Sequence, residues 1–362
     1  MKIGIDVSQM VYRGHGVGRY VEDLSRALLM RQDHDYIFYA GALRQRAYLT
    51  MRSKNKPWSR ATWRMPLIPP RLARFVWNYT KIPIERVVGK VDIFHTSDWT
   101  EPYTYSPAVT TVHDLAFRLY PETVAPLVRR VQTKRLARVI THGTHIIADS
   151  QSTKHDLMQL YAIPDTKIDV VYPGISARFE QQKKTEIERV KKKYNLPTQY
   201  ILTLGTKEPR KNLPRLIEAL SGLTIPLVVT GRQGWATQLA AHAQVIETGF
   251  IDDPDLPGLY SGATVFAFPS LYEGFGFPVL EAMACGTPVV TSNISSLPEV
   301  AGNAGILVDP RDSTSIRSGI NEAFGKQVFL QKRGLAQAKK FSWVDCADKT
   351  VKVYEKIYEH CG

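Results

Sequence analysis

The sequence FPSLYEGFGFPVLEAMACGTPVVT, residues 268–291, decides how the chain folds. The apolar run 265–268 that leads into it predicts a buried strand. Gly274 and Gly276 allow a tight loop that a ligand can approach closely. Pro278 suits a helix start, and Gly286 is placed like the glycine that follows a helix end. Strand, loop, helix and second strand therefore follow in order, and the free N–H groups of the helix start predict a phosphate site.

Two glutamates flank this predicted phosphate site. Glu273 lies in the loop, and Glu281 is expected in the first turn of the helix. A carboxylate accepts two hydrogen bonds and so matches the two hydroxyls of a vicinal diol. The pair therefore suits a nucleotide sugar, with the ribose on one side of the phosphates and a hexose on the other. The alternative is that both carboxylates only complement the helix dipole.

The run 273–290 also resembles the E-x7-E motif of glycosyltransferase family 4. The resemblance covers essentially the whole chain and is strongest from 200 to 310. It implies the α/β GT-B fold, in which two Rossmann-like domains face one another across a cleft and the C-terminal helix crosses back to the N-terminal domain. The expected domains are an acceptor-side domain, residues 1–175 with about 344–362, and a nucleotide-sugar-binding domain, residues 176–343.

Family resemblance also assigns roles to individual residues. His113 follows the strand 109–112, at the carboxyl end where active groups of open sheets gather, and would contact the donor hexose beside the anomeric centre. A lone histidine with a structural role is the alternative, and Asp114 is expected to support the loop. The implied catalytic residues are His113, Glu273, Arg210 and Lys211.

In the second domain, Glu-Pro-Arg-Lys at 208–211 matches a family sequence whose basic residues hold the donor diphosphate. Glu273 would hold the transferred hexose and Glu281 the ribose. Many relatives carry a further Arg where this chain has Thr206 and Lys207, so the pairing of side chains with phosphate oxygens stays open. The implied donor-binding residues are Gly16, Gly18, Arg19, Gly274, Phe275, Gly276, Val279, Leu280 and Glu281.

The N-terminal glycine loop, residues 12–19, follows the predicted strand 3–7 as in a Rossmann-like unit. Its glycines are spaced G-x-G-x-G rather than G-x-G-x-x-G, and this spacing disfavours an NAD-dependent oxidoreductase. A D-x-D string, Asp253 and Asp255, opens a predicted helix and is expected to cap it rather than to bind a metal. No cofactor is expected besides the donor substrate.

The predicted reaction is transfer of a hexose from a nucleotide diphosphate sugar with retention of configuration. Relatives with the Gly-Thr-x-Glu-Pro-Arg-Lys-Asn arrangement, residues 205–212 here, are often mannosyltransferases, so the resemblance implies GDP-mannose and a glycan or lipid-linked saccharide acceptor in surface polysaccharide synthesis. Three alternatives stay open: a UDP-sugar-dependent transferase of the same fold, an NAD-dependent oxidoreductase, and a basic nucleic-acid-binding module.

Positive charge is concentrated in residues 41–90, which hold twelve Lys or Arg and one acid, Glu85. Aromatic residues are interleaved with the basic ones, a composition that suits an anionic membrane surface. Nucleic acid and a solvated basic face are the alternatives. Three scattered cysteines, no signal-peptide core and no apolar run of about 18 residues predict a cytoplasmic protein, with the inner membrane face as a further expected location.

Overall fold

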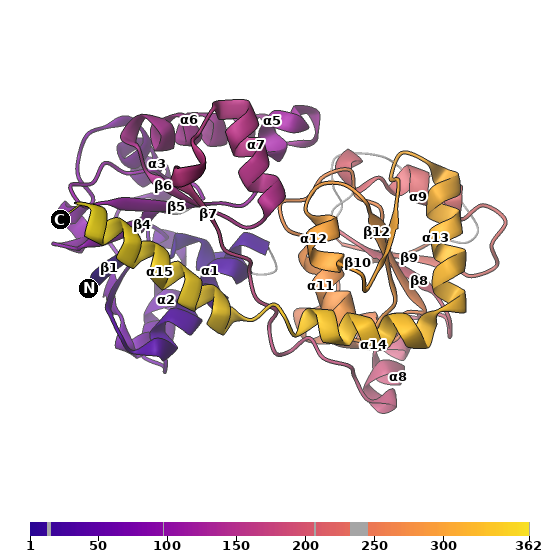
Figure 1. Ribbon diagram of the computed structural model, residues 1–362. Helices are drawn as coiled ribbons and strands as arrows, with labels where there is room; N and C mark the ends of the chain where they lie inside the picture. The colour runs from indigo at the N-terminus through magenta and orange to yellow at the C-terminus, as the bar shows by residue number, and fades with distance from the viewer. Residues whose placement is uncertain (13–15, 97, 206–207, 232–244, 362) are drawn as a thin grey trace. The chain divides into compact units, whose positions relative to one another are not determined.

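The computed structural model describes residues 1–12, 16–96, 98–205, 208–231 and 245–361. The chain forms two compact units, Met1–Gly174 with Trp343–Gly362, and Ile175–Ser342 (Figure 1). Each boundary lies one residue from the one expected from the sequence. Thr206 and Lys207, whose place at the phosphates was left open, lie outside the described residues.

Unit 1 is built on a seven-stranded sheet in the order β3-β2-β1-β4-β5-β6-β7. All pairings are parallel, with Ile3 opposite both Tyr36 and Ile93. The strands read as apolar runs because helices cover both faces of a parallel sheet. Their bounds are β1 Lys2–Asp6, β2 Asp35–Tyr39, β3 Thr62–Arg64, β4 Ile93–Thr96, β5 Ala108–Val112, β6 His145–Ala148 and β7 Ile168–Val170.

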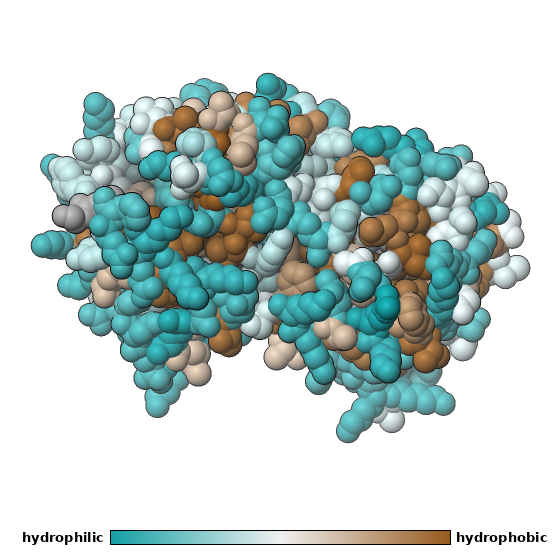
Figure 2. Space-filling model, viewed as in Figure 1, coloured by the Kyte–Doolittle hydropathy of each residue, from teal (hydrophilic) through white to brown (hydrophobic). Residues whose placement is uncertain are grey.

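The last helix of the chain, α15 (Trp343–Cys361), packs against α1 in unit 1, so the expected return to the N-terminal domain is confirmed. Val351, Val353 and Tyr354 are buried, and the Tyr354 hydroxyl lies 2.7 Å from His95 Nδ1 on β4. The visible side of α15 is largely hydrophilic in Figure 2. The other helices are α1 Gly16–Arg31, α2 Arg46–Ser53, α3 Pro70–Tyr79, α4 Glu85–Val88, α5 Ala116–Leu119, α6 Pro126–His142 and α7 Gln151–Tyr161.

Unit 2 is built on a six-stranded parallel sheet in the order β10-β9-β8-β11-β12-β13. Numbered within the unit, this is 3-2-1-4-5-6, the order of dinucleotide-binding folds. The strands are β8 Ile201–Leu204, β9 Leu227–Thr230, β10 Val245–Gly249, β11 Val265–Phe268, β12 Val289–Ser292 and β13 Ile306–Val308. The helices are α8 Lys184–Lys193, α9 Leu213–Ala219, α10 Leu256–Ser261, α11 Phe277–Ala284, α12 Leu297–Ala301, α13 Ser313–Gly325 and α14 Gln327–Ala338.

The predicted capping role is wrong for Asp255 of the D-x-D string. Asp255 stands before α10 but makes no side-chain capping bond. Its buried carboxylate instead accepts hydrogen bonds from Lys193 Nζ at 2.6 Å and the Tyr194 hydroxyl at 2.7 Å, and it pairs with Arg189. These partners hold the pKa of Asp255 at about 2 against the effect of burial, which raises it. Asp255 therefore links α8 to the start of α10 through these contacts.

Candidate donor site and the His113 pair

The strand order of unit 2 reverses between β8 and β11. These strands are direct neighbours, with Ile201 opposite Val265. Ligands of doubly wound sheets bind outside the carboxyl ends of the strands at such a reversal. The short helix η6 (Pro209–Lys211) follows β8 and carries Arg210 and Lys211, and the loop 269–276 follows β11 and carries Glu273. The fold therefore brings three of the predicted catalytic residues together.

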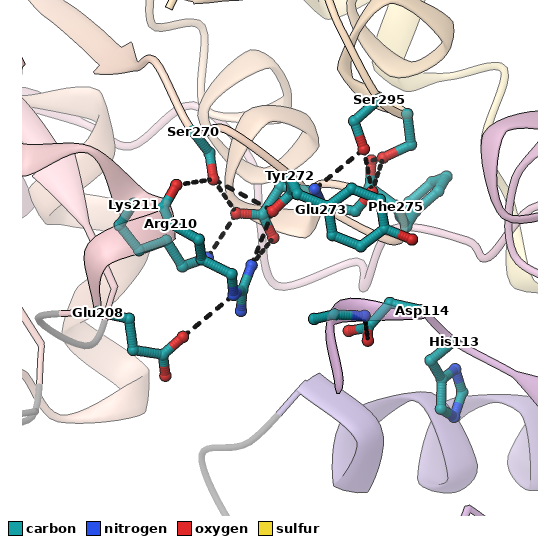
Figure 3. A network of polar contacts seen from close by, with 12 residues as sticks. His113, Asp114, Glu208, Arg210, Lys211, Ser270, Tyr272, Glu273, Phe275 and Ser295 are labelled. Carbon is teal, nitrogen blue, oxygen red and sulfur yellow. Dashed lines mark hydrogen bonds and ion pairs between the residues drawn. The ribbon is translucent and has the colours of Figure 1, made fainter. Parts of the chain in front are cut away.

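Glu273 is the centre of this cluster and is buried. Lys211 Nζ donates to its Oε1 at 2.7 Å, Ser270 Oγ donates to the same oxygen at 2.7 Å, and Arg210 Nη1 lies 3.1 Å from Oε2 (Figure 3). A carboxylate has about four acceptor positions, and side chains of the described residues occupy three of them. Glu273 therefore has room for one further hydroxyl rather than the two predicted, unless a partner moves away.

Charge in the cluster is balanced. Burial alone raises the pKa of Glu273, but Lys211 and Arg210 outweigh it and hold that pKa at about 2. Burial and the neighbouring Arg210 lower the pKa of Lys211, although Glu273 opposes them. Arg210 Nε also donates to Glu208 Oε2 at 3.1 Å. Among the described residues of this cluster, two cations thus face two carboxylates, and Arg210 and Lys211 are able to pair with phosphate oxygens.

Two serines that the sequence analysis missed fix the backbone of the Glu273 loop. Ser295 Oγ accepts from the Glu273 N–H at 3.0 Å and lies 2.6 Å from the Glu273 carbonyl oxygen. Ser296 Oγ lies 2.8 Å from the same carbonyl oxygen and 2.7 Å from that of Phe275. Hydroxyls that bond to backbone are typical of serines at turns and helix starts, and the Ser-Ser pair just before α12 is such a signal.

The start of α11 differs from the prediction. Gly276 is the N-cap residue with φ of 112°, a conformation that favours glycine. The N–H groups of Val279 and Leu280 both donate to its carbonyl oxygen, at 3.0 and 3.3 Å, so they are not the free phosphate donors expected. The side chains of Phe275, Val279 and Leu280 are buried. These side chains therefore contribute to a donor site by fixing the position of the backbone around it.

Glu281 lies in the second turn of α11, because the helix begins at Phe277, so the predicted first-turn position is wrong. Its side chain is buried. The Tyr260 hydroxyl, from α10, donates to Glu281 Oε2 at 2.8 Å. Sequence reasoning did not identify Tyr260, since the two residues belong to different helices. The tyrosine fixes the direction in which the carboxylate points.

In unit 1, His113 follows β5 as predicted and is paired with Asp149, which follows the neighbouring strand β6. His113 Nδ1 lies 2.6 Å from Asp149 Oδ2, and the Tyr20 ring packs edge-on against the imidazole at 4.7 Å. Burial lowers the pKa of His113, but Asp149 outweighs it and the net shift is upward. Asp114 Oδ1 accepts from the Ala116 N–H at 2.9 Å, which confirms its role in the loop.

The bond to His113 uses only one of the two carboxylate oxygens of Asp149. Asp149 is buried, and its Oδ1 has no hydrogen-bond partner in the described part of the chain. Burial raises the pKa of Asp149, opposed by His113. An ionised carboxylate can only accept hydrogen bonds, so its bond to Nδ1 leaves Nε2 of His113 as the imidazole atom available to a ligand.

The predicted glycine loop is partly helical. Gly16, Gly18 and Arg19 all lie in the first turn of α1, not in a loop that continues through Arg19. A Cβ atom on Gly18 would lie 2.4 Å from the Tyr12 carbonyl oxygen, so close packing requires glycine there. A Cβ on Gly16 would meet no atom within 4 Å. Of the two glycines, Gly18 therefore has a packing role that requires no ligand.

Two further observations concern metals and membranes. Within the described ranges, no group of three or more His, Cys, Asp or Glu residues is arranged to hold a metal ion. No helix among those residues is both long and apolar enough to cross a membrane.

Comparison with known proteins gives matches over both units. The model described as Glycosyltransferase Family 4 matches residues 14–179, and the one described as Glycosyl transferases group 1 matches residues 184–340. The chain is 34% identical to O-antigen chain mannosyltransferase B of Escherichia coli over 73% of this chain and 74% of that protein.

Two other relatives extend the comparison. The chain is 33% identical to the serotype-specific mannosyltransferase WbdA of Escherichia coli, over 69% of this chain and 34% of that longer protein. Its structure resembles that of HepE from Anabaena in complex with UDP-glucose, with a TM-score of 0.69, 18% identity and coverage of 98% of this chain and 100% of that one.

Proposed function

The chain belongs to glycosyltransferase family 4 and has the GT-B fold, and from this premise we propose that it transfers mannose from GDP-mannose to a saccharide acceptor with retention of configuration. The observation that carries this proposal is the cluster of buried Glu273 with Lys211 and Arg210 at the strand-order reversal of unit 2. The names of two relatives, O-antigen chain mannosyltransferase B and WbdA, support mannose and surface polysaccharide synthesis.

In the proposed mechanism, Arg210 and Lys211 bind the donor diphosphate. Arg210 supplies a planar fork of donors and Lys211 a compact charge. Both would stabilise the negative charge that develops on the departing nucleotide, an effect that contributes about 2.7–4 kcal/mol per preorganised donor in other enzymes. Glu273 would accept one hexose hydroxyl on Oε2, and Glu281, oriented by Tyr260, would accept the ribose hydroxyls.

His113 is also proposed to contact the transferred sugar. Asp149 fixes the ring through Nδ1, so Nε2 is the atom proposed to contact a hexose hydroxyl. Retention is proposed to follow the front-face path of the family, in which the leaving phosphate itself helps to deprotonate the acceptor. No metal takes part in this proposal.

A thermal-shift panel with GDP-mannose, UDP-glucose and ADP-glucose tests the donor site. A ligand that binds only the folded state stabilises it by about 2.7 kcal/mol at a hundred times Kd. The panel is run on wild type, on Glu281→Ala and on a control, Glu322→Ala, which changes an exposed side chain paired with Lys326. We expect a shift with GDP-mannose that is lost only in Glu281→Ala. A shift with UDP-glucose alone would replace the proposed donor, and equal shifts in all three proteins would refute the site.

A membrane-facing surface is proposed on α3 and α6, which pack against each other. On α3, Leu72, Phe75 and Tyr79 are exposed by 50%, 56% and 49%. Phe75 and Tyr79 stack at 5.4 Å, and Lys134 of α6 lies 4.8 Å above the Tyr79 ring. Exposed aromatic and aliphatic side chains flanked by cations suit an anionic bilayer interface. Trp58 and Trp77, in contrast, are buried and belong to the core.

Charge reversal at Arg71 and Arg74 tests this surface. Binding to liposomes that contain phosphatidylglycerol is measured by sedimentation for Arg71→Glu/Arg74→Glu and for a control pair on α8, Lys184→Glu/Lys192→Glu. Each basic residue near an anionic surface contributes about 1 kcal/mol, so the first variant should bind at least tenfold more weakly. Equal binding by both variants would count against the membrane-facing surface.

A further inference from the structure

A cavity lies in unit 1, away from His113. Its volume is about 780 Å³, and it is lined by Ala108, His145 and Ile168, the first residues of β5, β6 and β7. His113 and Asp149 follow the opposite ends of β5 and β6. Small-molecule sites have volumes of roughly 300–1,000 Å³. The cavity thus has the size of a ligand site at the amino edge of the sheet.

The floor of this cavity is an ordered polar network. His145 is buried, and its Nε2 lies 2.7 Å from Asp169 Oδ2. Lys356 of α15 donates to the same oxygen at 3.0 Å. Burial raises the pKa of Asp169, but Lys356 and His145 outweigh it and hold that pKa below its ordinary value. Asp169 is therefore a carboxylate at neutral pH, with acceptor capacity left for a hydroxyl group.

The remaining lining is rich in cations. Asp165 pairs with Lys154 at 2.7 Å, and Lys167 adds a third lysine, so lysines outnumber carboxylates. Three imidazoles, of His142, His145 and His360, add further donors. Burial lowers the pKa of His142, and the nearby Arg138 and Lys81 lower it further, as expected in positive surroundings.

The cavity also has an apolar wall. Pro107, Ile357 and the ring of Tyr103 line it, and Tyr103 meets His142 edge-on at 6.1 Å. An aromatic face suits the apolar face of a sugar ring, carboxylates accept from hydroxyls, and an excess of lysine suits a phosphate. We propose that this cavity is a second binding site for a phosphate-bearing saccharide of one or two rings.

Such a ligand would connect α15 with the rest of unit 1. Lys356 belongs to α15, whereas Lys154, Lys167 and Asp169 belong to α7, the short helix η5 (Asp165–Lys167) and β7. Occupancy would therefore stabilise the docking of the last helix. This proposal does not depend on the donor nucleotide or on the catalytic role of His113.

Isothermal titration with mannose 1-phosphate, mannose and inorganic phosphate tests the site. The probe variant is Lys167→Glu, which changes an exposed residue and leaves the floor intact, and the control is Lys352→Glu, an exposed position of α15 that does not line the cavity. Glu281→Ala separates this cavity from the donor site. Lys167 would donate a charge-assisted hydrogen bond to the phosphate, so we expect mannose 1-phosphate to bind Lys167→Glu at least tenfold more weakly than the other three proteins.

Three results would overturn the proposal. Equal affinity of Lys167→Glu and wild type would show that the ligand does not occupy the cavity. Loss of binding in Glu281→Ala would assign it to the donor site of unit 2. Inorganic phosphate binding as tightly as mannose 1-phosphate would show that the cavity holds phosphate without recognising the sugar.

Discussion

Replacing Asp149 with Asn isolates the charge that acts on His113. The substitution keeps the size of the side chain and an oxygen within reach of Nδ1, but removes the negative charge 2.6 Å from the imidazole. Because Asp149 opposes the effect of burial on the pKa of His113, that pKa should fall. The role proposed for Nε2 at the transferred hexose also depends on the orientation that this bond imposes.

The size of the effect follows from the kind of bond. A hydrogen bond to a charged group contributes about 1.5–3 kcal/mol. Loss of this bond lowers the pKa of His113, because the bond favours the protonated imidazole. The same energy, lost from transition-state stabilisation, lowers kcat/KM by about 10- to 150-fold.

Both quantities are measurable on the same proteins. Titration of the histidine Cε1–H signals by NMR gives the pKa of His113, and transfer from GDP-mannose to a saccharide acceptor gives kcat/KM. Asp169→Asn is the matched control, because it removes the carboxylate from another His–Asp pair of unit 1, at 2.7 Å from His145. We expect Asp169→Asn to lower kcat/KM much less than Asp149→Asn does.

The outcomes separate a functional pair from a structural one. If Asp149→Asn lowers the pKa of His113 but leaves kcat/KM at the wild-type value, the pair has no part in the reaction. If Asp169→Asn loses as much activity as Asp149→Asn, the effect is a general consequence of losing a His–Asp pair in unit 1. Either result would refute the reasoning.

Three further predictions concern stability and donor binding. The pKa of Glu273 is held at about 2, so its ionised form contributes about 3 kcal/mol to the free energy of unfolding. This contribution is complete above the ordinary glutamate pKa and is lost as the pH falls toward 2. Calorimetry at pH 7 should show unit 2 of Glu273→Gln less stable, and an unchanged transition would contradict this. Tyr260→Phe removes a bond to Glu281 and should weaken GDP-mannose binding about tenfold by isothermal titration, whereas equal affinity would leave that bond without a role in donor binding. Gly18→Ala should lower the free energy of unfolding by about 1–3 kcal/mol in thermal denaturation and Gly16→Ala should not, so equal losses would contradict the packing argument.

The fold and the position of the site could largely be predicted from the sequence, because glycines, prolines and apolar runs mark where the strands of a parallel sheet end. The run 265–291 does form β11, a glycine loop, α11 and β12. The cluster of Glu273 with Arg210 and Lys211 follows from two adjacent strand ends. Family resemblance, rather than spacing, supplied the roles.

Partners from distant parts of the chain were not predictable in this way. Asp149 and Tyr260 are separated from His113 and Glu281 by 36 and 21 positions, and only the packing of strands and helices brings each pair together. Tertiary bonds also displace local helix capping, at Asn212 as at Asp255. Asn212 stands at the N-cap of α9, but its amide donates to the carbonyl oxygens of Pro269 and Pro310, at 3.0 and 2.6 Å, so tertiary bonds replaced the local one.

The order in which the chain leaves the ribosome acts differently on the two units. Unit 2 is one continuous segment, and the N–H of Ile175 donates to the Phe341 carbonyl oxygen at 3.1 Å, which joins its two ends. It is therefore complete in the nascent chain before Trp343 is added. Unit 1 begins first but finishes last, because α15 supplies the buried Val351 and Tyr354. Until then its sheet lacks one apolar cover, so a chain that stops at residue 342 would contain a whole unit 2 and an unfinished unit 1.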